Sequence, residues 1–235
     1  MKIFGIGDLH LSFDENVDKP MDAFGNLWNN YEKRLKEKWE SLVCEEDVVI
    51  VPGDISWGIK LSEAIPDLEF ISKLPGKKIL LRGNHDLWWS RIKYLNTLYE
   101  NIFFLQNNCY FIEKANIAIA GTRGWILPSS PDFSTHDEKI FNREIIRLEL
   151  SLKEAKKKNP SKIICATHYP PMEENLLKNG LTDLMKEYGV SKCIYGHLHG
   201  ENAFRKGVKG KVDDIEYNLV SLDYLGVTPK LILEI

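Results

Sequence analysis

Short apolar runs rich in β-branched residues alternate with longer amphipathic stretches along most of the chain. The runs predict buried strands at 48–51, 78–81, 102–105, 109–113 and 117–120, and three more that lead into Asp8, His168 and His197. Apolar residues at near-helical spacing predict helices at about 24–43, 62–74, 137–158 and 173–188, and a tryptophan-rich helix that ends near residue 99. The tail 215–235 alternates apolar and polar residues, which predicts a meander of antiparallel strands.

This order of elements indicates the fold class. Helices alternate with strands first, and short strands then follow one another, so we predict a layered α/β/β/α sandwich with two mixed β-sheets flanked by helices. No internal repeat or low-complexity segment interrupts the chain, and 235 residues suffice for one sizeable core. We therefore expect a single domain over 1–235.

Polar side chains that bind metals follow five of the predicted strands, each within two residues of the strand end. Because the carboxyl ends of parallel strands meet at one edge of a sheet, these side chains are expected to converge there. The set contains five of the six histidines, together with three aspartates and one asparagine. Its members are Asp8, His10, Asp54, Asn84, His85, Asp86, His168, His197 and His199. The pattern predicts a metal site at the carboxyl-end edge.

The residue types narrow the kind of metal site. Asp, His and Asn offer oxygen and nitrogen without thiolate, which suits manganese, iron or zinc in a hydrolytic site, with manganese as our first choice. The candidate ligands are too many for one tetrahedral ion and fit two divalent ions that share the Asp54 carboxylate. Two such ions, about 3.5–4 Å apart, can hold a phosphoryl group and lower the pKa of a bridging water. With Asp8 and Asp54 as the anionic ligands, a positive surplus remains that a phosphate ester and a bridging hydroxide would neutralise.

These motifs, in this order, resemble the calcineurin-like metallophosphoesterases over positions 8 to 199. The strings are Asp8-Leu9-His10, Gly53-Asp54, Gly83-Asn84-His85-Asp86, His168 and Gly196-His197-Leu198-His199. The resemblance implies a β-sandwich flanked by helices. It also implies a first metal held by Asp8, His10, Asp54 and His199, and a second held by Asp54, Asn84, His168 and His197. His85 would then face the leaving-group oxygen and be oriented by Asp86.

The same residues allow other interpretations. A lone His10 or His168 would more often be a structural histidine, and Asp86 could merely cap a helix. A non-catalytic scaffold of the same superfamily is the alternative function, but such members lose ligands or the leaving-group histidine, and this chain keeps both. A metallo-β-lactamase-like or amidohydrolase site would need strings that do not occur here. Cyclic-nucleotide phosphodiesterase, other phosphodiesterase and phosphomonoesterase activities all stay open.

Several residues bear on the substrate. Trp57, Trp88 and Trp89 could rim the site and stack on a base or sugar, or could pack in the core. Arg123 could bind a substrate phosphate bidentately or lie at the surface, and Arg143 is a further candidate. His136 follows no strand, and we expect it to be a surface or capping residue.

Charge and composition limit the partners. A net charge of −3 argues against general nucleic-acid binding. The N-terminal apolar run is too short for a signal peptide, no run reaches membrane-spanning length, and the four cysteines form no Cys-x-x-Cys pair. We expect a cytoplasmic enzyme that acts on a small phosphorylated substrate, with nucleotides among the candidates, and that does not bind membranes. The pattern leaves the oligomeric state open.

Overall fold

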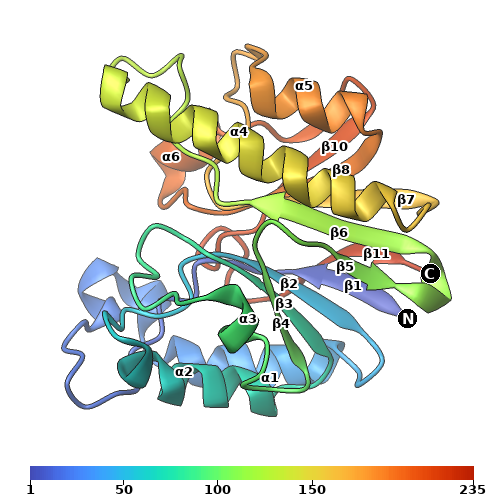
Figure 1. Cartoon of the computed structure of the whole chain (residues 1–235). Coiled ribbons are helices and arrows are strands. Elements are labelled where there is room, and N and C mark those ends of the chain that lie inside the picture. The colour runs from blue at the N-terminus through green and yellow to red at the C-terminus, as the bar shows by residue number, and fades with distance from the viewer.

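The computed structural model describes residues 1–235 and contains two β-sheets packed face to face (Figure 1). The first sheet has the order β11-β1-β2-β3-β4, in which β1 to β4 are parallel and β11 is antiparallel to β1. Its strands are β1 (Lys2–Gly5), β2 (Val48–Pro52), β3 (Lys77–Leu81), β4 (Ile102–Leu105) and β11 (Lys230–Glu234).

The second sheet has the order β5-β6-β7-β8-β10-β9, with a parallel centre and antiparallel edges. Its strands are β5 (Tyr110–Ile112), β6 (Ile117–Thr122), β7 (Lys162–Thr167), β8 (Val190–Tyr195), β9 (Gly210–Val212) and β10 (Ile215–Leu219). Both sheets are mixed, as the sequence predicts.

Helices cover the outer faces of both sheets (Figure 1). Below the first sheet lie α1 (Tyr31–Leu42), α2 (Leu61–Lys73) and the short α3 (Ile92–Leu95). On the second sheet lie α4 (Thr135–Lys156) and α5 (Gly180–Glu187), and α6 (Glu201–Lys206) follows the loop after β8. Three short 3₁₀ turns complete the list: η1 (Met21–Phe24), η2 (Asn26–Trp28) and η3 (Glu113–Ala115). The predicted α/β/β/α layering is confirmed.

The apolar runs are continuous because most strands are buried on both faces. In β2, Val48 and Ile50 point into the layer between the sheets, whereas Val49 and Val51 pack under the helices. A third cluster of buried side chains fills the space between the second sheet and α4 and α5. Since successive side chains of a strand face opposite sides, a strand between two apolar layers needs no polar positions.

Several predicted boundaries are wrong. The first helix begins at Tyr31 and not near residue 24, because Gly25 (φ 122°) and Asn30 (φ 47°) break the helical path into two 3₁₀ turns. The helix predicted from residue 173 begins only at Gly180, where the Asn179 side chain caps its N-terminus. The tryptophan-rich helix shrinks to Ile92–Leu95, and α6 has no counterpart in the prediction.

The predicted C-terminal meander is also wrong. β10 pairs in parallel with β8 in the second sheet, whereas β11 crosses to the first sheet and pairs antiparallel to β1. Alternation of apolar and polar residues identifies a strand but does not choose its partner. The crossing joins the two sheets at the end where β1, β2, β3, β7 and β8 terminate, since Gly7 N–H donates to Val220 O (2.7 Å) and Leu222 N–H donates to Gly7 O (3.0 Å).

Candidate metal centre

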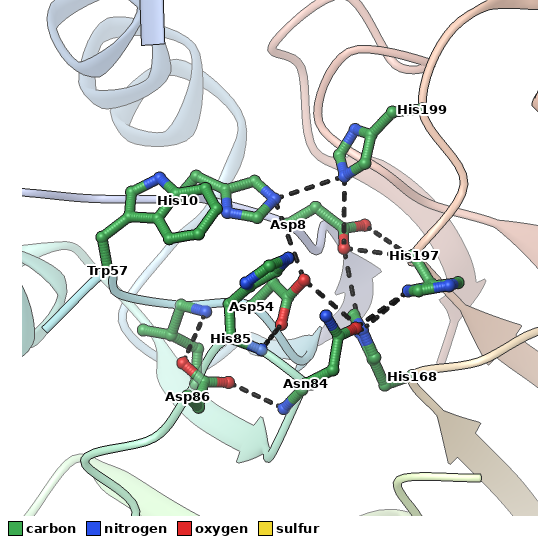
Figure 2. A network of polar contacts seen from close by, with 12 residues as sticks. Asp8, His10, Asp54, Trp57, Asn84, His85, Asp86, His168, His197 and His199 are labelled. Carbon is green, nitrogen blue, oxygen red and sulfur yellow. Dashed lines mark hydrogen bonds and ion pairs between the residues drawn. The ribbon is translucent and has the colours of Figure 1, made fainter. Parts of the chain in front are cut away.

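The seven predicted metal ligands converge at the carboxyl ends of five strands (Figure 2). Both sheets contribute: the loops after β1, β2 and β3 belong to the first sheet, and those after β7 and β8 belong to the second. The side chains are Asp8, His10, Asp54, Asn84, His168, His197 and His199. The strand-end rule therefore places residues far apart in the sequence in one cluster.

The first group of donor atoms comes from Asp8, His10 and His199. The Nε2 atoms of His10 and His199 lie 3.2 Å apart, and Asp8 Oδ1 lies 3.9 Å from His199 Nε2. Asp8 and His10 are almost completely buried, whereas His199 is partly open to solvent. One ion could contact all three side chains.

The second group comes from Asp54, His168 and His197, with Asn84 beside them. His168 Nε2 lies 3.2 Å from His197 Nδ1 and 3.4 Å from Asp54 Oδ2. Asn84 Oδ1 lies 2.7 Å from His168 Nε2 and 2.9 Å from His197 Nδ1. These four donors again face a common point.

Asp54 occupies the position expected of a bridging ligand. Its Oδ1 accepts the backbone N–H of His85 (2.8 Å), which fixes the carboxylate. Its Oδ2 lies 3.4 Å from His168 Nε2 in one group and 3.9 Å from His10 Nε2 in the other. The carboxylate thus stands between the two groups of ligands.

The donor set fits a pair of divalent metal ions. Ligand atoms that share an ion at about 2.0–2.2 Å lie about 3.0–3.5 Å from each other. The separations given above run from 2.7 Å (His168 to Asn84) to 3.9 Å (His199 to Asp8), and all donor atoms within each group of three (Asp8, His10, His199; Asp54, His168, His197) lie within 4.8 Å of one another. The imidazole nitrogens His197 Nδ1 and His168 Nε2 face each other at 3.2 Å, so one cation could bind both in place of a shared proton. Oxygen and nitrogen donors without thiolate suit a hydrolytic ion.

The backbone at the strand ends is strained at the ligands themselves. Asp8 (φ 57°), His10 (φ 47°), Asp54 (φ 49°) and His197 (φ 71°) all adopt the left-handed conformation, which L-residues other than glycine seldom occupy. Such strain costs of the order of 1–3 kcal/mol per residue and is found mainly at functional sites. The turns point these side chains inward.

Two glycines allow the ligand carboxylates to approach the backbone. A Cβ atom at Gly83 would lie 2.1 Å from Asp54 Oδ1, and one at Gly196 would lie 2.4 Å from Asp8 Oδ2. Both distances are far below van der Waals contact, so only glycine fits at either position. The glycine before Asn84 and the glycine before His197 are therefore part of the site.

Hydrogen bonds outside the cluster fix the histidine tautomers. His168 Nδ1 lies 3.0 Å from the carbonyl oxygen of Pro52, which can only accept, so Nδ1 carries the proton and Nε2 keeps a lone pair for a metal. His199 Nδ1 lies 3.1 Å from Asp223 Oδ1, and Asp223 Oδ2 accepts the Gly200 N–H. The sequence analysis missed Asp223, although a carboxylate four residues after β10 was an available signal.

Burial sets the charges of the clustered side chains. Loss of solvent lowers the pKa of His168 to about 3 and that of His197 to about 2. Both rings are therefore uncharged near pH 7 and can each offer a nitrogen lone pair to a metal. Burial also raises the pKa of Asp8 and of Asp54, and for Asp8 the nearby Asp54 charge adds to the rise. Against the cost of burial, the hydrogen bond to Asp223 and the Asp8 charge raise the pKa of His199 to about 9. A bound cation would stabilise the ionised carboxylates.

His85 lies beside the cluster, and its ring nitrogens form no hydrogen bond within the protein. Its ring packs against Trp57 (centroids 4.4 Å apart) and lies 5.6 Å from the ring of His10. The structure thus leaves the imidazole free to contact a ligand next to the metal ligands.

The expected contact between Asp86 and the His85 ring is absent. The buried Asp86 carboxylate accepts the backbone N–H groups of Gly83 (2.7 Å), Ile55 (2.9 Å) and Ser56 (3.2 Å), and the indole N–H of Trp88 (3.0 Å). The Asp86 carboxylate thus satisfies three buried backbone N–H groups and one indole N–H, which would lose their partner if it turned to the His85 ring. Asp86 therefore ties the loop that carries Asp54 to the loop that carries His85.

The tryptophans divide between the site and the core. Trp57 is half-buried and stacks on the ring of His10, with centroids 4.7 Å apart. Trp88 and Trp89 are buried, and the Trp89 indole N–H donates to Gln106 Oε1 (2.7 Å). Trp57 lies at the rim, and Trp88 and Trp89 are core residues.

Arg123 packs beside the site through its backbone. Its carbonyl oxygen accepts the N–H groups of His168 (3.0 Å) and Tyr169 (2.9 Å). Its guanidinium lies 4.5 Å from the Trp125 ring and 3.8 Å from the buried Glu144, and only 18% of the side chain is exposed. The surface interpretation of Arg123 is wrong, and a role in substrate binding stays a prediction.

The other two candidates lie on α4. Arg143 is exposed, and His136 is exposed in the first turn of the helix, whose N-cap is Ser134. His136 is thus the one histidine outside the cluster and its rim.

The comparisons with known proteins agree with this geometry. The family model for calcineurin-like phosphoesterases matches residues 1–201. The chain belongs to the calcineurin-like phosphoesterase family. Its two clusters of candidate ligands fit divalent metal ions. None of its helices combines the length and apolar character needed to cross a bilayer.

Solved structures share the phosphoesterase fold at low sequence identity. Phosphopantetheinyl hydrolase (PptH) from Mycobacterium tuberculosis is 14% identical, with a TM-score of 0.61 and coverage of 100% of this chain and 96% of that one. TT1561 of Thermus thermophilus is 13% identical, with a TM-score of 0.55 and coverage of 85% and 82%. AQ665 from Aquifex aeolicus, a protein of unknown function, is 16% identical, with a TM-score of 0.50 and coverage of 98% and 95%.

Two phage proteins match in sequence over a shorter stretch. The Gene 66 proteins of Mycobacterium phages L5 and D29 are 37% and 32% identical over 82 residues, which are 34% and 29% of this chain. The matches span 37% and 41% of the phage proteins, so the chain covers about two fifths of their length.

Proposed function

We propose that this metallophosphoesterase hydrolyses small phosphate esters, mono- or diesters, at a centre of two divalent metal ions. Manganese is the first candidate metal, with iron and zinc as alternatives. The observation that carries the proposal is the Asp54 carboxylate, which stands between two converging groups of ligands. One ion would be held by Asp8, His10, Asp54 and His199, and the other by Asp54, Asn84, His168 and His197.

Such a pair of ions supplies Lewis acidity and lowers the pKa of a coordinated water toward neutrality. The protein's own contribution begins with charge. Two divalent ions carry four positive charges, and Asp8 and Asp54 return two negative ones, so the site keeps a surplus that attracts a phosphate ester. The neutral rings of His168 and His197 bind without reducing this surplus.

His85 is the residue that we propose acts on the leaving group. Its backbone N–H donates to Asp54 Oδ1, which fixes the His85 backbone next to the bridging carboxylate. Because no protein group occupies its ring nitrogens, one N–H can be donated to the departing oxygen of the ester. A positioned acid of this kind contributes about 10²–10⁴-fold to the rate. Asp86 supports the step indirectly, since it anchors the backbone at Gly83 and Ile55 on either side of the site.

The test combines metal content with activity. The purified protein should contain two metal ions per chain and hydrolyse bis-p-nitrophenyl phosphate or p-nitrophenyl phosphate with added Mn²⁺. Asp54→Asn should remove most of the activity and lower the metal content to one ion or none, because the shared ligand is lost. Asp132→Asn, which changes an exposed aspartate in the loop before α4, is the matched control and should change neither.

Two results would overturn the proposal. An Asp54→Asn protein that keeps two tightly bound ions and normal turnover would contradict the binuclear arrangement. A metal-loaded protein that hydrolyses neither ester, nor other phosphate esters such as nucleotides, would favour the scaffold function instead.

A further inference from the structure

A cavity of about 520 Å³ opens beside His10, His85 and His199. This volume lies within the range of about 300–1,000 Å³ that small-molecule sites occupy. Its far wall is apolar and consists of Met21, Phe24, Trp28 and Trp57. We call this space the aromatic pocket.

Part of the wall comes from the start of the first predicted helix, at about residues 24–28. Met21 and Phe24 lie in η1 and Trp28 lies in η2, so the two 3₁₀ turns present three large apolar side chains to the same side. Trp57 joins them from the loop after β2, and its indole N–H is directed to the sulfur of Met21 (3.2 Å). The break in the predicted helix at Gly25 thus builds one wall of the pocket.

Phe24 is the part of this wall that has the least contact with the protein. Its side chain is 71% exposed, whereas Met21 and Trp28 are buried at 7% and 6%. An exposed phenylalanine at the mouth of a cavity gains burial only when something apolar enters. A ligand in the pocket could therefore bury Phe24.

The lining also restricts the charge of the ligand. No lysine or arginine lines the pocket, and Asp223 is its only acidic residue. Both Asp223 oxygens already accept hydrogen bonds, from His199 and Gly200. Positive charge is confined to the histidine side of the pocket and to Lys19, whose ammonium lies 5.8 Å from the Trp57 ring centroid, so the aromatic wall itself favours a neutral, ring-bearing group.

We propose that the aromatic pocket receives the alcohol part of the phosphate ester and selects esters of bulky, neutral, ring-bearing alcohols, such as aryl alcohols or nucleosides. This inference rests on the proposed function. The decisive feature is His85, which lines the pocket and lies next to the metal ligands. If a phosphoryl group bound beside the metal ligands had its leaving oxygen toward His85, the alcohol attached to that oxygen would enter the aromatic pocket beside Phe24 and Trp57.

The experiment compares 1-naphthyl phosphate with phenyl phosphate, whose alcohols have similar acidity and differ by one fused ring. The protein should prefer the naphthyl ester by about 10-fold in kcat/KM, the discrimination that added apolar contact gives in a pocket. Phe24→Ala should remove most of this preference, mainly through KM, because the fused ring loses more contact with Phe24 than the phenyl ring does. The high exposure of Phe24 means that the variant should fold normally.

The matched control is Phe13→Ala. Phe13 is also exposed (44%) and contacts Phe70, but it does not line the pocket, so this variant should leave both esters unaffected. A binding measurement accompanies the kinetics. Because Trp28 and Trp57 line the pocket, 1-naphthylphosphonate should quench tryptophan fluorescence and bind more tightly than phenylphosphonate, and Phe24→Ala should remove that difference.

The outcomes separate this inference from the proposed function. Equal losses on both esters in Phe24→Ala, or a naphthyl preference that survives the substitution, would overturn the pocket assignment while leaving the phosphoesterase function intact. Failure of the metal-loaded protein to hydrolyse these esters, bis-p-nitrophenyl phosphate or any other phosphate ester would instead contradict the proposed function. The phosphonate titration would still report whether the pocket binds aromatic rings.

Discussion

The hydrogen bond between Asp223 and His199 allows a prediction that concerns only one of the two metal ions. Asp223 Oδ1 lies 3.1 Å from His199 Nδ1 and orients the ring so that Nε2 faces Asp8 and His10. Removing such a partner typically weakens metal binding by about 10–100-fold, which corresponds to about 1.4–2.8 kcal/mol. His199 belongs to the first group of ligands only, so Asp223→Ala should weaken that ion and spare the other.

Calorimetric titration of the metal-free protein with Mn²⁺ or Zn²⁺ should resolve the two binding events. In Asp223→Ala one dissociation constant should rise by about 10–100-fold and the other should stay unchanged. Asp223→Asn should have a smaller effect, because its amide oxygen can still accept from Nδ1 but carries no charge. Asp214→Asn, which changes an exposed aspartate near β10, serves as the control. Equal weakening of both ions, or none of either, would refute the assignment of His199 to a single ion.

Three further predictions follow from the same geometry. His85→Ala should keep both metals and lower kcat by about 10²–10⁴-fold for esters with alkyl leaving groups, with a much smaller loss for p-nitrophenyl phosphate. The control variant His136→Ala should be unaffected. Equal losses on both ester types would show that His85 does not act as the acid. Gly83→Ala should lower metal content and activity, because its Cβ would lie 2.1 Å from Asp54 Oδ1. Gly210→Ala, whose Cβ would meet no neighbour, should leave the metal content unchanged. Chelation should lower the melting temperature, since an ion at 100 times its dissociation constant stabilises the fold by about 2.7 kcal/mol; an unchanged melting temperature would argue against a bound metal in the native protein.

The position of the candidate site could be predicted from the sequence because it depends on short-range signals. Each ligand follows a β-branched run within a few residues, and parallel strands bring their carboxyl ends together whatever the length of chain between them. His10 and His199 are 189 residues apart, yet the rule places them in one group of donors. The two-sheet layering follows in the same way from the order of the elements.

What could not be predicted depends on contacts that have no local pattern. The Asp86 carboxylate faces Ile55 and Ser56 and not His85, because the conformation of both loops decides which donors it meets. β11 joins the first sheet, although its alternation of residues would suit either sheet. Residues 24–28 fall within the predicted helix, but the positive φ of Gly25 breaks it, and Phe24 and Trp28 become part of the wall of the aromatic pocket.

The candidate centre joins the two sheets, and this has a consequence for stability. Asp8 and His10 extend from the first sheet and His199 from the second, so an ion in the first group would link the sheets at their open edge. The same edge is linked by the backbone bonds of Gly7 to Val220 and Leu222. Burying carboxylates, and holding ligand residues in the left-handed backbone conformation, both cost free energy, and a bound cation offsets that cost. Metal binding and packing of the sheets are therefore coupled, and loosening of the sheets should begin at the strand ends that carry the ligands.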